Sequence, residues 1–324
     1  MITLAESNNK LRYRDHCLLD ASVPIFCRDW WLDAVAPGQW DVALVTENGR
    51  VIAAMPYVMR QRMVFNFISQ PPLTQFSGPW LAPNIRREQK RLEFEKKLFC
   101  SLIKQLPRFH YFDQNWNFRL TNWIPFYWSG FQQTTRYTYR LENIDSENLI
   151  WKGLSSNIRR EIRKAVGRFS LTLRSSPTID EFLELNELTF SRQGKDIPYK
   201  RDMVRRIDNA CLARDCRKIF IAEDSEGRAH AGVYIVWDES SAYYLMGGGH
   251  PSLRTSGATS FVMWEAIKFS ASVTESFDFE GSMIEPIERF FRAFGATQTP
   301  YHRVFKTNSR ILNIIRGLKD SLQS

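Results

Sequence analysis

The residues best suited to chemistry lie in the last sixth of the chain, where an acid and a lysine follow apolar runs. The alternating run Phe277–Phe279 ends in Glu280 and a glycine. A short amphipathic helix is expected over 289–296, and a last strand over 301–306 ends in Lys306. Because a packed sheet can aim the residues at its strand ends into a cleft, Glu280 and Lys306 are candidate site residues.

A second candidate is a strongly cationic helix. It is expected to begin near Ser155, and it places Arg160, Lys164 and Arg168 four residues apart with Arg163 beside them. Its opposite face is apolar and suited to burial. Two interpretations are open. The cations form a solvated surface, or Arg160, Arg163 and Lys164 contact phosphate groups or tRNA, since clustered cations neutralise phosphate charge.

Length and composition indicate a folded protein of two domains. The chain of 324 residues is too long for one ordinary core and suits two domains of about 150 residues each. An apolar content of 44% argues against disorder. No apolar run approaches the roughly 18 residues that would cross a bilayer. No basic segment followed by an apolar core is visible at the N-terminus, so we expect a cytoplasmic protein.

The charge balance points to acidic partners. Lysine and arginine number 44 against 35 aspartates and glutamates, a formal net charge of +9. Such a surplus favours nucleotides, tRNA or an anionic membrane face, although a solvated surface explains it equally well.

The cysteines and histidines give no sign of a metal site. The five cysteines are scattered and odd in number, and no Cys-x-x-Cys pair occurs. No histidine stands at metal-ligand spacing from another histidine or cysteine. We therefore expect reduced cysteines and no bound metal.

An internal repeat organises the chain. Residues 42–58 and 219–236 both read as an apolar strand, an acidic turn closing on Gly-Arg, and a second apolar strand, which is the pattern of a hairpin. Helical patterns cover 86–106, 180–193 and 257–270, with strand-like runs between them. Two copies of one mixed α/β unit explain both observations.

The join between the copies is expected in the polar segment Glu142–Glu147. This gives an N-terminal domain over residues 1–145, a C-terminal domain over residues 146–307, and a tail over residues 308–324.

From Trp151 to Lys306 the chain resembles the Fem-type aminoacyltransferases, a family within the GNAT acyltransferase superfamily, and its first half resembles them more loosely. The resemblance implies the α/β class (mixed α+β) with two tandem GNAT-like domains, each a twisted mixed β-sheet flanked by helices. It also implies that the amphipathic tail Ile311–Leu322 packs back onto the first domain. No long charged heptad segment is present for the coiled-coil arm of some Fem proteins, which weakens an assignment to interpeptide bridge synthesis.

The resemblance implies two catalytic residues. Phe305-Lys306 corresponds to a Phe-Lys pair of the Fem-type enzymes, and Lys306 would stabilise the oxyanion or the leaving group when an amine attacks an activated carbonyl. Asp113, after Tyr111 and Phe112, lies near an aspartate proposed as general base in some members. A base at this place needs a raised pKa, which burial can supply. The alternatives are a solvated lysine and an ion-paired or helix-capping aspartate.

The resemblance also implies a substrate-binding set of Arg192, Tyr244, Phe305 and Glu280. Fem-type enzymes use an arginine near Arg192 to hold an acidic substrate, and they place a substrate-contacting tyrosine on the strand of Tyr244. The neighbouring Tyr243 leaves open which of the two tyrosines faces inward. A capped helix, core packing and a turn that shapes the cleft floor are the structural alternatives for Arg192, Tyr244 and Glu280.

One motif bears on the acyl donor. Acyl-CoA-using GNAT enzymes bind the pyrophosphate on an Arg/Gln-x-x-Gly-x-Gly/Ala turn, through free backbone N–H groups at a helix N-terminus. Arg254 and Gly257 fit its first half, but Thr259 stands where glycine or alanine is usual. The pattern favours a donor other than CoA.

The leading hypothesis is therefore an acyltransferase that forms an amide on an amine acceptor. In its fullest form it moves an aminoacyl group from charged tRNA to a nucleotide-linked or lipid-linked precursor of the cell envelope, such as peptidoglycan. No cofactor would be tightly bound, and peripheral membrane contact is compatible with this function whereas DNA binding is not expected. The first alternative is an acyl-CoA-dependent N-acyltransferase acting on an envelope or polysaccharide sugar. The second is an inactive module that binds RNA or nucleotide-linked ligands.

Overall fold

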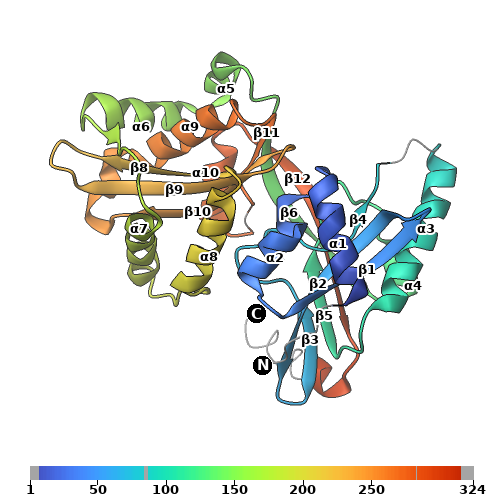
Figure 1. Ribbon diagram of the computed structural model, residues 1–324. Coiled ribbons are helices and arrows are strands. Elements are labelled where there is room, and N and C mark those ends of the chain that lie inside the picture. Colours follow the sequence, from blue (N-terminus) through green and yellow to red (C-terminus); the bar gives the residue numbers. More distant parts are fainter. Residues whose placement is uncertain (1–6, 84–86, 282, 315–324) are drawn as a thin grey trace. The chain divides into compact units, whose positions relative to one another are not determined.

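The structure is a computed structural model, and it describes residues 7–83, 87–281 and 283–314. The chain forms two compact units (Figure 1). Unit 1 contains residues 1–136 and 300–324, and unit 2 contains residues 137–299.

The chain passes between the units within two strands, β6 (Gln132–Glu142) and β12 (Thr297–Thr307). The predicted domain boundary at 145/146 follows β6, whereas the units divide inside that strand. The structure assigns residues 300–307, which we expected in the second domain, to unit 1. They belong there because β12 pairs with β5 (Tyr111–Asn115) and buries Val304 in the core of unit 1.

Unit 1 is built on a mixed sheet. Its neighbouring strands run in the order β1–β2–β3–β5–β12, with β4 beside β2. Only the β3–β5 pair is parallel among these strands. The other strands and helices of unit 1 are β1 (Trp40–Glu47), β2 (Arg50–Arg62), β3 (Phe65–Ser69), β4 (Trp80–Leu81), α1 (Asn8–Leu19), a 3₁₀ turn (Ile25–Cys27), α2 (Asp29–Val35), α3 (Glu88–Gln105) and α4 (Ile124–Trp128).

The core of unit 1 is aromatic. Trp116 packs edge-on against Phe126 at 4.7 Å between ring centroids and stacks on Phe99 at 6.0 Å. Phe112 of β5 and Val304 of β12 lie in the same cluster, and neither is exposed. A strand from the end of the chain thus completes a core that the first third of the chain begins.

Unit 2 has its own mixed sheet. Its strands run in the order β6–β11–β10–β9–β8–β7, and the β10–β11 pair is parallel while the other pairs with a known register are antiparallel. The strands after β6 are β7 (Thr172–Leu173), β8 (Arg217–Glu223), β9 (Ala229–Trp237), β10 (Ala242–Gly249) and β11 (Ser276–Asp278).

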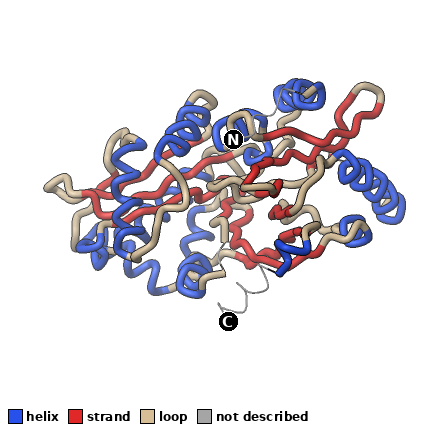
Figure 2. The backbone as a smooth tube through the Cα atoms, turned by 90° about the horizontal axis from the view of Figure 1, so that it is seen from below, coloured by secondary structure: helices blue, strands red, loops and turns tan. Residues whose placement is uncertain are grey.

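Helices cover both faces of the sheet in unit 2, as Figures 1 and 2 show. On one face, α9 packs on β8 and β9 and is itself covered by α6, while α7 packs on β9 and β10 from the other face. The helices of this unit are α5 (Glu147–Gly153), α6 (Ser156–Gly167), α7 (Ile179–Arg192), α8 (Arg201–Leu212), α9 (Ala258–Ser270) and α10 (Glu285–Arg292), and a 3₁₀ turn spans Pro251–Ser256.

Both predicted hairpins are confirmed. In β1–β2, Glu47 pairs with Arg50 around Asn48 and Gly49, whose φ angles of 51° and 79° are those that a two-residue hairpin turn requires. The strands β8 and β9 form the second hairpin. The predicted helix over 180–193 is also confirmed as α7, which begins at a capping box between Thr178 and Glu181.

In the part of the chain that the structure describes, no helix is both long and apolar enough to cross a bilayer. The predicted tail helix Ile311–Leu322 falls largely on residues 315–324, which are outside the described residues.

Candidate functional site

The end of strand β11 in unit 2 is held rigidly by a buried ion pair. Asp278 accepts hydrogen bonds from the Thr138 hydroxyl at 2.5 Å and from Arg140 Nη1 at 2.9 Å. Asp278 and Arg140 are each only 2% exposed, and Arg140 also donates to Glu142 and Ser276. A buried pair that satisfies this many hydrogen bonds fixes the backbone that follows it.

The residues after Asp278 adopt a tight left-handed turn. Glu280 has a φ of 60° and donates its backbone N–H to Asp278 Oδ1 at 2.8 Å. Gly281 has a φ of 54°, and a Cβ atom at this position would lie 2.1 Å from the carbonyl oxygen of Tyr137. A left-handed backbone is costly for a residue other than glycine, so the surrounding structure must enforce the conformation of Glu280.

Glu280 is partly buried, and one oxygen of its carboxyl group lacks a partner. Its Oε1 atom is buried and makes no hydrogen bond to any of the residues the structure describes. Burial, and then the charge of Asp278, raise the pKa of Glu280 well above its ordinary value.

Two tyrosines of unit 2, Tyr199 and Tyr244, are partly buried. Burial, followed by the charges of Glu280 and Tyr199, raises the pKa of Tyr244, and burial raises the pKa of Tyr199 to about 12. Both hydroxyls are therefore protonated at neutral pH. Tyr199 donates to Asn186 Oδ1 at 2.8 Å, and Asn186 Nδ2 donates to the carbonyl of Gly247 at 2.7 Å. We call Glu280, Tyr244, Tyr199 and Asn186 the Glu280 cluster.

The structure decides which of the two adjacent tyrosines faces this cluster. Tyr243 is 2% exposed, and its hydroxyl donates to Asp238 at 3.2 Å, away from Glu280. Tyr244 packs its ring against Phe291 of α10 at 5.8 Å. Its hydroxyl lies over Gly247, where a Cβ atom would be only 2.0 Å away. A glycine at 247 is thus needed for the position of Tyr244.

The sequence did not point to two members of this cluster. Tyr199 and Asn186 lie outside any motif, and only the packing of α7 on β10 brings Asn186 to Gly247. Arg192, by contrast, is exposed at the end of α7, followed by Gly194 with a φ of 62°. No contact joins Arg192 to the Glu280 cluster in the described residues.

The two predicted catalytic residues lie in unit 1, on β5 and β12, and they project from opposite faces of the sheet. Lys306 pairs with Phe112, and Phe305 pairs with Asp113. Because paired residues share a face and neighbours along a strand alternate, Lys306 and Asp113 are on opposite sides. They do not form one constellation.

Each of these two residues has partners of its own. Lys306 Nζ donates to the carbonyl of Ser129 at 2.8 Å and lies 5.0 Å from the ring centroid of Phe131. Asp113 accepts from Arg303 through both carboxylate oxygens, at 2.8 and 2.5 Å, and from the Tyr111 hydroxyl at 2.7 Å. The ion pair with Asp113 raises the pKa of Arg303. This geometry is that of the ion-paired alternative for Asp113.

Asp113 and Arg303 line a small polar cavity of about 280 Å³ in unit 1. Its other lining residues are Ser69, Gln70, Pro71, Thr74, Asn115 and Arg136. The walls are fixed in part by Gln70, which accepts the backbone N–H of Asn115 at 2.8 Å. Two guanidinium groups and one carboxylate give the cavity a positive balance that suits an anionic group.

The basic helix α6 carries less free charge than its sequence indicates. Glu161 forms ion pairs with Lys164 and, at 4.0 Å, with Arg160. Arg163 lies over the ring of Trp151 at 5.7 Å. The side chain of Arg160 is 74% exposed, Arg163 is also exposed, and the side chain of Lys164 is 25% exposed.

The backbone of α6 packs against the glycine turn at the start of α9. Gly257 has a φ of 83°, and a Cβ atom there would lie 2.2 Å from the carbonyl oxygen of Glu161. The first glycine of the possible CoA motif is therefore used for packing between two helices.

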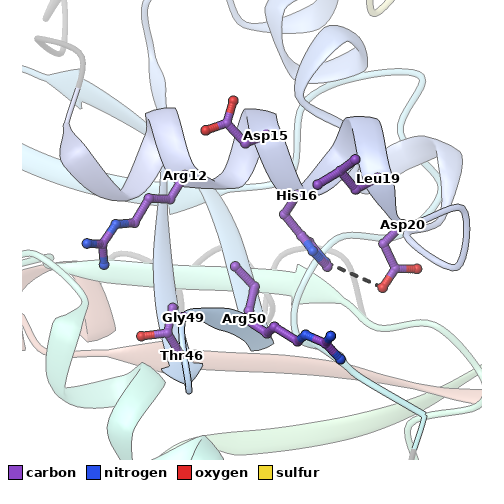
Figure 3. A pocket seen from close by; sticks show the side chains of 9 residues that line it. Arg12, Asp15, His16, Leu19, Asp20, Thr46, Gly49 and Arg50 are labelled. Carbon is purple, nitrogen blue, oxygen red and sulfur yellow. Dashed lines mark ion pairs between the residues drawn. The ribbon is translucent and has the colours of Figure 1, made fainter.

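A separate groove of about 560 Å³ lies in unit 1 between α1 and the β1–β2 hairpin (Figure 3). Arg12 and His16 project into it from one face of α1, and Arg50 comes from the hairpin. The His16 side chain is 10% exposed, and its Nε2 lies 3.9 Å from Asp20 Oδ2. Burial lowers the pKa of His16. No motif in the sequence pointed to this groove.

Residues 152–282 match the family model of the acetyltransferase (GNAT) domain. The matched segment is less than half of the chain. It contains Arg192, Tyr244, the basic helix α6 and Glu280, whereas Asp113, Phe305 and Lys306 lie outside it. A search of curated proteins found no match to the chain.

Solved structures share the fold over nearly the whole chain. The crystal structure of FemX is 12% identical with a TM-score of 0.68, and the match covers 90% of this chain and 95% of FemX. The C-terminal domain of a putative lysylphosphatidylglycerol synthetase from Agrobacterium fabrum is 11% identical with a TM-score of 0.59, covering 98% of this chain and 97% of that domain. A tandem GNAT protein from the clavulanic acid biosynthesis pathway is 12% identical with a TM-score of 0.52, covering 94% and 97%.

These similarities confirm the predicted fold class. The chain has the fold of the tandem GNAT proteins, residues 152–282 match the GNAT family model, and the expected resemblance to Fem-type proteins holds at the level of the fold. The same fold serves several acyltransferase chemistries, so the substrate is a matter for the residues of the site.

Proposed function

We propose that this protein forms an amide by moving an aminoacyl group from charged tRNA to an amine of a cell-envelope precursor, in the cytoplasm. The observation that carries the proposal is a GNAT domain within a chain that shares its fold with FemX over 90% of its length. The similarity to a lysylphosphatidylglycerol synthetase domain supports aminoacyl transfer in particular.

The packing around Gly257 supports a donor other than acyl-CoA. A diphosphate bound at a helix N-terminus needs free backbone N–H groups and space beside the glycine. The carbonyl of Glu161 occupies the space at Gly257, and Thr259 narrows the approach further. In this proposal the tRNA phosphates instead meet the exposed cations of α6, above all Arg160.

In the proposed reaction an amine attacks the ester carbonyl of the charged tRNA, and negative charge develops on the carbonyl oxygen. Lys306 is proposed to stabilise that charge, as a positioned cation does in acyl transfer. Asp113 is less suited to remove the amine proton, because Arg303 already engages both of its oxygens. Its proposed role is to hold Arg303 at the polar cavity of unit 1.

Acyl-CoA-dependent transfer to an envelope sugar is the second candidate function. The observation in its favour is the family model itself, which describes an acetyltransferase domain.

A thermal-shift panel followed by a transfer assay tests the proposal. The panel contains acetyl-CoA, a lysine-containing UDP-muropeptide and bulk aminoacyl-tRNA, each at about 100 times its Kd, where binding adds about 2.7 kcal/mol of stability. We expect stabilisation by the muropeptide and the tRNA, and transfer of a radiolabelled amino acid to the muropeptide. Stabilisation by acetyl-CoA alone would overturn the donor assignment. Binding of tRNA with no product from any donor would favour an inactive binding module.

The basic helix can be tested in the same material. Arg160→Glu with Lys164→Glu should weaken tRNA binding and reduce its salt dependence, because each phosphate contact contributes a slope of about 0.7–0.9 in log K against log salt. Arg205→Glu with Arg206→Glu on α8 makes the same change of charge on another exposed helix of unit 2 and serves as the control. If both double variants bind equally well, α6 is plain surface.

A further inference from the structure

The turn between strands β2 and β3 has two large apolar residues where a hairpin ordinarily has small polar ones. Arg62 pairs with Phe65, so Met63 and Val64 are the two turn residues. Met63 has a φ of 53°, a left-handed conformation in which glycine, asparagine or aspartate is usual. Met63 is 89% exposed and Val64 is 73% exposed, so neither contributes to the core. An apolar pair at such a turn is explained by a contact outside the protein.

Two arginines precede this turn on β2. Arg60 and Arg62 are two residues apart on the strand, so their side chains project from the same face of the sheet. Burial, and then the charge of Arg62, lower the pKa of Arg60, which indicates that the two cations repel each other. Within the described ranges neither arginine forms an ion pair. Two like charges held beside one turn favour an anionic partner.

Two further segments of the chain meet at the same end of the sheet in unit 1. His110, just before β5, accepts the backbone N–H of Asn66 through Nδ1 at 2.8 Å and donates its own N–H to the Asn66 carbonyl at 2.9 Å. Asn308, just after β12, donates its N–H to the His110 carbonyl at 2.8 Å. Arg108 and the helical residues 310–314 therefore lie at the end of the sheet that carries the β2–β3 turn, the lower end of unit 1 in Figure 1.

These segments add residues of the same two kinds. Arg108 and Arg310 are exposed, and Ile311 and Ile314 are 60% and 65% exposed. No aspartate or glutamate occurs in any of the three segments, which are residues 48–87, 96–112 and 289–314. The Met63 surface, as we call it, consists of Met63, Val64, Ile311, Ile314, Arg60, Arg62, Arg108 and Arg310.

The apolar residues of the Met63 surface distinguish a membrane from a nucleic acid. Proteins that bind single-stranded nucleic acids stack the bases on aromatic side chains. The exposed apolar residues here are methionine, valine and isoleucine, which are aliphatic. Aliphatic side chains between arginines are suited to a bilayer surface, where the apolar groups enter the acyl region and the guanidinium groups meet the lipid phosphates.

We propose that the Met63 surface docks on a bilayer of anionic lipids, with Met63 and Val64 inserted below the headgroups and the arginines at the lipid phosphates. The docking is peripheral and reversible, because a small apolar anchor holds a protein on a membrane only together with basic residues. The inference goes beyond the proposed function and does not depend on it, since membrane binding requires neither a donor nor an acceptor.

The turn itself provides a variant that removes the apolar contact and keeps the hairpin. Met63→Asn with Val64→Gly gives the β2–β3 hairpin the Asn-Gly turn that Asn48 and Gly49 form between β1 and β2. Because Asn-Gly is preferred in a two-residue turn, the melting temperature should not fall. Binding of the full-length protein to vesicles of equal parts phosphatidylglycerol and phosphatidylcholine, measured by cosedimentation, should weaken at least about tenfold, the effect of losing roughly two buried methylene groups.

The matched control for the turn variant is Leu18→Ser with Leu19→Ser. These residues of α1 are 83% and 88% exposed, but they adjoin Asp15 and Asp20 in the sequence rather than arginines. The control should bind the vesicles as the wild type does. Equal binding by the wild type and the turn variant would overturn the proposal, and so would a wild type that does not bind these vesicles.

The second test concerns the charges. Arg62→Gln with Arg108→Gln should weaken vesicle binding about 25-fold at low salt, since each basic residue near an anionic surface contributes about fivefold. Arg12→Gln with Arg50→Gln removes the same charge from other exposed positions of unit 1 and should change binding little. Added salt should weaken wild-type binding, because it screens these charges. Equal binding of the wild type to vesicles of phosphatidylcholine alone would contradict the proposal.

Bulk tRNA tests the alternative occupant. If Arg62→Gln with Arg108→Gln loses tRNA binding while the turn variant binds vesicles normally, the Met63 surface contacts nucleic acid and the proposal fails. If no donor gives product while the wild type still binds the anionic vesicles through the Met63 surface, the proposed function fails and membrane docking stands.

Discussion

At the scale of single residues, neighbours decide what each acid can do. Asp278 and Glu280 are two residues apart at the end of one strand. The first is bound by Arg140 and Thr138, and the second has a buried oxygen without a partner. An ion pair of this kind fixes structure, whereas a carboxyl without a partner is available for a ligand or a proton.

Lys306 is the residue for which the proposed chemistry makes the clearest prediction. Lys306→Ala should lower kcat by about 10²–10³-fold, as expected for the loss of one group that stabilises a developing oxyanion. The melting temperature should change by only a few degrees, because Lys306 contributes one hydrogen bond to Ser129 and no buried charge pair. The measurement is steady-state transfer with a thermal melt of the same preparation.

Lys104→Ala, an exposed lysine on α3, is the control for the loss of a positive charge in unit 1. Near-normal turnover of Lys306→Ala would remove this lysine from the mechanism and leave it as a structural contact to Ser129.

At the scale of elements, glycines set how closely helices approach their neighbours. Gly248 of β10 lets the backbone of α7 approach, since a Cβ atom there would lie 2.5 Å from Asn186 N. Gly257 does the same for α6 and α9. Packing against α7 thus explains the glycine at position 248, and packing against α6 explains the glycine at position 257. Neither glycine requires a bound phosphate.

Gly257→Ala should therefore destabilise the protein by about 2–4 kcal/mol, because the new methyl group meets the Glu161 carbonyl and the backbone has a left-handed φ. Guanidinium chloride unfolding measures the change as a shift in the midpoint. Gly167→Ala, in the last turn of α6 with nothing within 4 Å of the added Cβ, should be neutral or slightly stabilising. Equal stability of the two variants would mean that the Glu161 carbonyl of α6 does not pack against Gly257.

At the scale of the whole molecule, unit 1 depends on a strand that the chain supplies only after it has built unit 2. Strand β12 pairs with β5, buries Val304 and brings Arg303 to Asp113. The first 136 residues alone lack this strand.

A stop codon after Thr299 should abolish the cooperative unfolding of unit 1, because it exposes the core beside Phe112 and leaves Asp113 without its arginine. Tryptophan fluorescence reports mainly on this unit, since seven of the ten tryptophans precede residue 137. A stop codon after Asn308 keeps β12 and should leave the transition in place. If the chain that ends at Thr299 unfolds with the same cooperative transition as the full-length protein, unit 1 folds without β12.

The sequence by itself determined the local structure and the candidate residues. The hairpins and the capped helix α7 follow from turn residues, caps and periodicity over stretches of about 10–20 residues, and the resemblance to Fem-type proteins rests on motifs such as Phe305-Lys306. These signals are local, so they do not need the tertiary fold.

The tertiary structure alone decided how those residues are combined. It put Lys306 and Asp113 on opposite faces of one sheet, directed Tyr243 to Asp238 and Tyr244 to Phe291, and paired Asp278 with Arg140, 138 residues away in sequence. The register between distant strands sets all three outcomes, and a shift of one residue would reverse the face of every side chain. That register is fixed by burial and pairing across the whole chain, which no local pattern of residues contains.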